Sequence, residues 1–164
     1  MTNVSPGKNA PAFSLPGLDG EKYSLAEALK KGPVVAAFFK ITCPICQFTF
    51  PFLERVYETY GDSKATFWGI SQDDARDTSD FCKEFGVKFP ALIDEDGYPV
   101  SNQYGLTNVP TVLLIGPDGK AIVSTTGFDK AALEKINAEV ARSSGKPEQP
   151  LFLPGEIVPD YKPG

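Results

Sequence analysis

Residues 34–46 read Val-Val-Ala-Ala-Phe-Phe-Lys-Ile-Thr-Cys-Pro-Ile-Cys. The first six, Val34–Phe39, are apolar without interruption, which is typical of a strand buried on both faces in the middle of a sheet. From Pro44 to about Tyr60, apolar residues recur at helical spacing, so a long helix is expected to follow. The two cysteines of this stretch are therefore predicted to lie between a buried strand and the helix after it.

That position suits dithiol chemistry. Cys43 is expected at the helix N-terminus, where unpaired N–H groups and the helix dipole favour an anion and bring thiol pKa values into the range of roughly 3.5–7.5. Cys46, one turn further, is within disulfide reach but more shielded. An exposed thiolate followed by a resolving neighbour is what thiol–disulfide exchange needs. The alternative is two buried cysteines at a chance spacing, because free cysteine is often a core residue.

Composition excludes several classes of function. The chain has 164 residues, a net charge of −5 and no histidine. The acidic balance disfavours nucleic acid and anionic membranes as partners. Without histidine there is no Ser-His-Asp triad, no Cys-His dyad and no imidazole metal ligand, and three cysteines are too few for a four-thiolate cluster. We expect neither a metal nor an organic cofactor.

The sequence also bears on localisation. The longest apolar run, Val34–Phe39, is far shorter than the roughly 20 residues of a membrane span. Residues 1–12 lack the apolar region of a signal peptide. We expect a cytoplasmic protein if Met1 is the natural start, and a periplasmic or otherwise extracytoplasmic one if a leader has been removed.

The rest of the chain predicts one α/β domain at residues 1–142 and a proline-rich tail at residues 143–164. After an irregular lead-in at 1–12, the expected elements are a hairpin over 13–25, a short helix capped by Ser24, a strand at 66–70, a helix at 78–85, an ambiguous segment at 89–93, one or two helical turns at 100–104, a hairpin over 111–125 and a helix from Asp129 to Arg142. Parallel inner strands and an antiparallel edge pair follow from this order. The tail has five prolines, is expected to lack regular structure, and carries enough apolar residues to lie as an extended strap on the domain or on a partner. The oligomeric state stays open.

The residues from Phe38 to Cys46, with Pro51 beyond them, resemble the active-site segment of thioredoxin-like proteins. Val109-Pro110-Thr111 resembles the cis-proline segment of that superfamily. The match covers roughly residues 10–142 and is best to the TlpA-like and redoxin (AhpC/TSA-like) branch, whose insertion the segment 65–105 resembles. The resemblance implies a thioredoxin-like fold: a central mixed sheet flanked by helices, here with an N-terminal hairpin extension.

The resemblance also implies a function. The chain would be a thiol–disulfide oxidoreductase in which Cys43 is the nucleophile and Cys46 the resolving thiol. Its partner would be a protein or a small molecule carrying a disulfide or dithiol. The implied substrate-binding residues are Thr42, Pro44, Val109 and Pro110. The backbone of Val109 would offer an edge to an extended substrate segment.

Three positions depart from the family pattern. The tryptophan common before the first cysteine is Thr42, the buried aspartate of thioredoxins is Ala37, and the glutamate of many TlpA-like proteins is Thr49. The usual proton acceptor for resolution is therefore missing. The redox potential stays open over about −270 to −120 mV.

A second interpretation is a thiol peroxidase similar to peroxiredoxins, with Cys46 as the peroxidatic thiol. Such an enzyme needs a positioned donor, normally an arginine near the strand that begins at Thr111. The nearest arginines in the sequence are Arg76 and Arg142. Their distance along the chain disfavours this interpretation.

Cys82 keeps the peroxidase alternative open, because it lies on the next predicted helix, as the resolving cysteine does in one peroxiredoxin subgroup. Its position between Phe81 and Phe85 favours a small core residue over a redox partner. A third interpretation is a binding module that uses the fold as a platform and leaves its cysteines idle.

Overall fold

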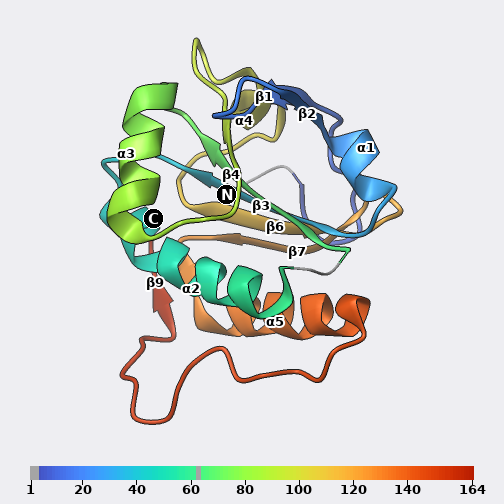
Figure 1. Cartoon of the computed structure of the whole chain (residues 1–164), viewed down its shortest axis with the longest axis vertical. Helices are drawn as coiled ribbons and strands as arrows, with labels where there is room; N and C mark the ends of the chain where they lie inside the picture. Colours follow the sequence, from blue (N-terminus) through green and yellow to red (C-terminus); the bar gives the residue numbers. More distant parts are fainter. Residues whose placement is uncertain (1–3, 62–63) are drawn as a thin grey trace.

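A mixed five-stranded sheet forms the centre of the computed structural model, which describes residues 4–61 and 64–164. The strands are β3 (Val34–Phe39), β4 (Thr66–Ser71), β5 (Ala91–Ile93), β6 (Thr111–Ile115) and β7 (Ala121–Thr126), in the order β5-β4-β3-β6-β7. β5, β4 and β3 are parallel, whereas β6 and β7 are antiparallel to their neighbours. The predicted α/β class and mixed sheet are confirmed (Figure 1).

Helices cover both faces of this sheet. The long helices α2 (Pro44–Tyr60) and α5 (Lys130–Ser144) lie side by side on one face, with α3 (Ala75–Phe85) at the edge of the same layer (Figure 1). The short helices α1 (Leu25–Leu29) and α4 (Pro99–Gln103) lie on the other face. In the described part of the chain, no helix is long and apolar enough to cross a membrane.

The side chains of β3 point alternately into two hydrophobic cores, one on each face of the sheet, which explains the continuous apolar run of this strand. Val35, Ala37 and Phe39 pack in the core under α2, α3 and α5. The intervening residues of the strand pack in the second core, on the opposite face of the sheet. Since successive strand residues point to opposite faces and both faces are covered, every position of β3 is buried and apolar.

The N-terminal hairpin follows the prediction. β1 (Ser14–Pro16) and β2 (Lys22–Ser24) pair antiparallel, and the Ser24 hydroxyl accepts the Glu27 N–H at 3.4 Å, capping α1. Of the irregular lead-in predicted for residues 1–12, residues 4–12 run beside the β6–β7 turn, and residues 1–3 lie outside the described residues.

Some element boundaries differ from the prediction. α3 begins at Ala75 rather than Thr78, because Asp74 caps it: the Asp74 carboxylate accepts the Asp77 N–H at 2.8 Å. The ambiguous segment 89–93 contains β5, which adds to the parallel side of the sheet through β4.

The prediction that residues 143–164 lack regular structure is wrong at both ends of that segment. α5 continues to Ser144, and β9 (Tyr161–Lys162) pairs antiparallel with β8 (Phe128–Asp129). Pro159 and Pro163 flank β9 without falling inside it, so its backbone N–H groups remain able to pair.

The tail between α5 and β9 is fixed to the domain by several contacts. The Arg55 guanidinium donates to both carboxylate oxygens of Glu156, at 2.8 and 2.6 Å, and these hydrogen bonds lower the pKa of Glu156 to about 2. Leu151 is buried, and the Phe152 ring packs 5.1 Å from that of Phe52. The tail is therefore part of the packed structure.

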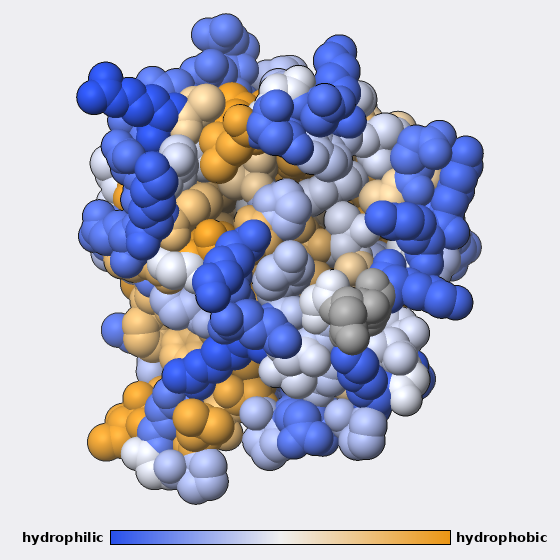
Figure 2. Space-filling model, in the orientation of Figure 1, coloured by the Kyte–Doolittle hydropathy of each residue, from blue (hydrophilic) through white to orange (hydrophobic). Residues whose placement is uncertain are grey.

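The surface seen in Figure 2 intersperses polar and apolar residues. Apolar residues gather at the lower left, where the tail loop of Figure 1 lies. The tail includes three of the exposed large hydrophobic side chains: Leu153 (56% exposed), Ile157 (98% exposed) and Tyr161 (53% exposed).

We predict that Phe50→Ala destabilises the fold by about 3–5 kcal/mol, the usual cost of deleting a buried phenylalanine. Phe50 is fully buried, and its ring packs against Phe39, Phe81 and Phe89. Urea denaturation measures the free energy of unfolding. Ile157→Ala is the control and should change it by less than about 0.5 kcal/mol. A loss below about 1 kcal/mol for Phe50→Ala would contradict this view of the core.

Candidate active site

Cys43 is the N-cap residue of α2. Its backbone is extended, at φ −83° and ψ 112°, and its Sγ accepts the backbone N–H of Cys46 at 3.0 Å. The thiol also donates to the carbonyl oxygen of Val109 at 3.5 Å. The half-buried Cys43 sulfur thus replaces a serine or aspartate cap and faces the unpaired N–H groups of the helix end.

Cys46 lies one turn into α2 and is fully buried. Burial raises the pKa of its thiol, and its hydrogen bond with Cys43 raises it further. Cys46 is therefore a protonated thiol at neutral pH. The two sulfurs also differ in access, because only Cys43 is partly open to solvent.

The loop before Cys43 is held by side chains on two neighbouring elements. The Asp73 carboxylate accepts the Ile41 N–H at 2.8 Å, and the Gln47 side-chain amide donates to the Ile41 carbonyl at 2.9 Å. No role was assigned to Asp73 or Gln47 from the sequence. The feature that could have revealed the Asp73 contact is the parallel pairing of β3 and β4. It brings the residues that follow both strands to one edge of the sheet.

The Val109–Pro110 peptide bond is cis, and this segment lies opposite Cys43. The Gly127 N–H donates to the Pro110 carbonyl at 2.8 Å, and the Thr111 hydroxyl donates to the Asn108 carbonyl at 2.7 Å. The backbone carbonyls of Asn108 and Pro110, on either side of Val109, therefore both accept hydrogen bonds that hold the loop in place.

A groove of about 470 Å³ opens beside the Cys43 sulfur. Of the four predicted substrate-binding residues, Pro44 and Val109 line it. Thr42 is exposed next to Cys43 without lining the groove, and Pro110 is buried behind Val109. The structure adds lining residues that sequence reasoning missed: Lys40, Gln72, Tyr98, Ser101, Asn102, Leu106, Thr107, Asn108 and Gly164.

Thr49 occupies the turn of α2 after Cys46 and is fully buried. Its hydroxyl has no hydrogen-bond partner among the described residues. The position where many relatives have a carboxylate therefore holds a neutral group here.

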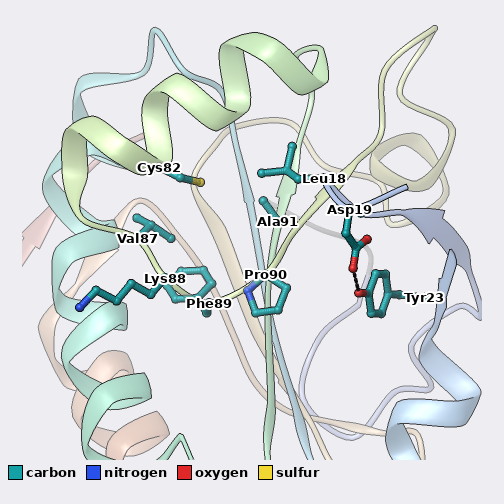
Figure 3. A pocket seen from close by; sticks show the side chains of 10 residues that line it. Leu18, Asp19, Tyr23, Cys82, Val87, Lys88, Phe89, Pro90 and Ala91 are labelled. Atoms are coloured by element: carbon teal, nitrogen blue, oxygen red, sulfur yellow. Dashed lines mark hydrogen bonds between the residues drawn. The ribbon is translucent and has the colours of Figure 1, made fainter. Parts of the chain in front are cut away.

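Cys82 lies away from the groove. It projects from α3 into a separate cavity of about 230 Å³, toward Leu18 and Ala91 (Figure 3). Burial raises the pKa of its thiol to about 11, with a further contribution from the Glu54 carboxylate. Within residues 4–61 and 64–164, no cluster of three or more Cys, Asp or Glu side chains could hold a metal ion.

We predict that alkylation of Cys82 by iodoacetamide, measured in Cys43→Ser/Cys46→Ser protein, rises about tenfold per pH unit from pH 8 to pH 10. Only the thiolate reacts, and a thiol with a pKa of about 11 is about one part in a thousand thiolate at pH 8. A short cysteine peptide is the control and should level off near its own pKa of about 8.5. A plateau for Cys82 at that same pH would contradict the raised pKa.

Comparison with known proteins identifies the family of the chain. Residues 6–123 match the AhpC/TSA family. The chain is 29% identical to thiol-disulfide oxidoreductase ResA of Bacillus subtilis, over 76% of this chain and 69% of that protein. It is 31% identical to ResA of Halalkalibacterium halodurans, over 79% of this chain and 74% of that protein.

A solved structure supports the fold. The thioredoxin domain of a thiol-disulfide oxidoreductase from Bacteroides vulgatus superimposes with a TM-score of 0.75 at 23% identity, over 84% of this chain and 99% of that domain. The chain therefore belongs to the AhpC/TSA family and, within it, to the thiol-disulfide oxidoreductases that resemble ResA.

Proposed function

We propose that the chain exchanges a Cys43/Cys46 dithiol for the disulfide of a protein or small-molecule partner. The observation that carries this proposal is the asymmetry of the two thiols. The half-buried Cys43 sulfur caps α2 and accepts the Cys46 N–H at 3.0 Å, whereas Cys46 is fully buried behind it. One sulfur is placed to attack and the other to resolve.

In the reducing direction, the Cys43 thiolate attacks one sulfur of the partner's disulfide. The partner's S–S bond breaks, its departing sulfur takes up a proton, and a mixed disulfide to Cys43 forms. Cys46 then loses its proton and attacks the Cys43 sulfur, which releases the second partner thiol. Two electrons pass to the partner, and a Cys43–Cys46 disulfide remains. The oxidising direction is the reverse of these steps.

Specific groups support the first step. The Cys46 N–H and the end of α2 stabilise negative charge on the Cys43 sulfur. Pro44 and Val109 border the groove through which a partner disulfide would approach. Extended polypeptides bind exposed backbone edges by main-chain hydrogen bonds, and Val109 is the residue we propose for that contact.

The peroxidase alternative has less support. It requires Cys46 to meet peroxide, but Cys46 is fully buried and its pKa is raised. Arg76 is exposed on α3 and Arg142 pairs with Glu139 on α5, and neither lines the groove beside Cys43. Neither arginine is therefore placed to orient a peroxide next to the dithiol.

We predict that Cys46→Ser protein accumulates a mixed disulfide between Cys43 and a disulfide-bonded substrate such as insulin, because attack can occur and resolution cannot. Cys43→Ser should lower the rate of disulfide exchange by at least about a hundredfold, since the nucleophile is lost. Mass spectrometry of acid-quenched samples detects the mixed disulfide, and stopped-flow thiol assays give the rate. Cys82→Ser is the control and should behave as the unmodified chain does. Exchange that survives Cys43→Ser would contradict the assignment.

We predict that one equivalent of hydrogen peroxide oxidises the reduced protein slowly and leaves a Cys43–Cys46 bridge. Timed thiol loss and peptide mapping measure the rate and the product. Rapid oxidation through a Cys46 sulfenic acid, or a Cys46–Cys82 bridge, would instead identify a peroxidase.

A further inference from the structure

The last four residues, Tyr161–Gly164, run from β9, which pairs with β8, to the loop that faces Cys43, where Gly164 contacts Val109. After β9, the chain reaches the groove of the active site, where Gly164 is one of the lining residues. The Asn108 side-chain amide donates to the Gly164 carbonyl at 3.5 Å. Figure 1 shows this end of the chain beside the first turn of α2, which begins next to Cys43.

Gly164 packs directly on the carbonyl group of Val109. A Cβ atom at Gly164 would lie 2.4 Å from the Val109 carbonyl oxygen and 3.0 Å from its carbon, too close for any side chain. The same carbonyl oxygen accepts the Cys43 thiol at 3.5 Å. One backbone group thus contacts both the nucleophilic sulfur and the tail.

The opposite side of the tail rests on Gly127, which adopts a φ of +80°. A Cβ atom there would lie 2.3 Å from the Lys162 carbonyl oxygen and 3.0 Å from the Gly164 nitrogen, and its third near neighbour would also belong to the tail. The Lys162 ammonium lies 5.1 Å from the centre of the Phe48 ring on α2. The tail occupies this position because residue 127 has no side chain.

We propose, building on the exchange function above, that Tyr161–Gly164 acts as an internal competitor for the Val109 backbone edge. An extended partner polypeptide needs that edge for main-chain hydrogen bonds, and the tail covers its carbonyl. A small disulfide needs only an approach to the Cys43 sulfur. The docked tail therefore slows exchange with protein disulfides and leaves exchange with small disulfides unchanged, because the fraction of molecules with a free edge sets the apparent affinity for a protein.

The test compares two substrates in single-turnover reactions of the pre-reduced protein. In each, the Cys43/Cys46 dithiol is oxidised to its disulfide, and two electrons reduce one disulfide of the substrate to two thiols. Insulin serves as the protein substrate, and 5,5′-dithiobis(2-nitrobenzoate) serves as the small one. The quantity of interest is the ratio of the two second-order rate constants.

Gly127→Ala should raise the ratio of the insulin rate constant to the small-disulfide rate constant at least fivefold. The new methyl group would clash with the backbone of Lys162 and Gly164 and displace the tail from Val109. Gly119→Ala is the matched control: Gly119 has a similar φ of +84°, but a Cβ there meets no atom within 4 Å. It carries a comparable backbone strain without touching the tail and should leave the ratio unchanged. Gly164→Ala, which leaves Gly127 intact, should also raise the ratio by pushing the tail off Val109.

An unchanged or lowered ratio in both Gly127→Ala and Gly164→Ala overturns the proposal, as does an equal rise in Gly119→Ala. A lowered ratio would mean that the tail is part of the surface that receives the protein substrate. If the unsubstituted protein oxidises with neither substrate, the exchange function itself fails. Failure of the function and failure of the tail proposal are thus distinguished in one experiment.

Discussion

The antiparallel pairing of β3 with β6 is the constraint on which the active site depends. Phe38 lies opposite Thr111, so the end of β3 and the beginning of β6 meet at one edge of the sheet. The residue four positions after β3 is Cys43, and the residue two positions before β6 is Val109. Their contact at 3.5 Å follows from this register, and a shift of one residue would turn the strand's core residues to the opposite face.

Helix geometry then makes the two thiols unequal. Cys43 and Cys46 lie three positions apart, on one side of α2, but the first is at the end of the helix and the second is under the next turn. The end position supplies N–H donors, whereas at the inner position burial is the largest cause of the raised pKa of Cys46. The same helix therefore stabilises charge on one sulfur and opposes it on the other.

The elements that carry the two cysteines could be predicted from the sequence, because each is marked by a pattern within its own residues. The bounds of β3 and α2 follow from an uninterrupted apolar run and from helical periodicity, and both are confirmed. The role of Asp73 could not be predicted in the same way, because it depends on two parallel strands ending at one edge. β9 was missed because its two-residue pairing with β8 is a tertiary contact between segments about 30 residues apart, in a stretch where proline content argues against strands.

The departure at Thr49 and the burial of Cys46 together bear on which step of exchange is slow. Resolution needs the Cys46 thiolate, and the rate of attack depends on its abundance. Burial raises the Cys46 pKa, and the turn that follows it presents only the neutral, unpartnered hydroxyl of Thr49 in the described structure. The first attack meets no such obstacle, since Cys43 is half-exposed and receives an N–H donor. The raised pKa of Cys46 therefore favours slow resolution of the mixed disulfide relative to its formation, so we expect a partner polypeptide to hold the Val109 edge until Cys46 attacks.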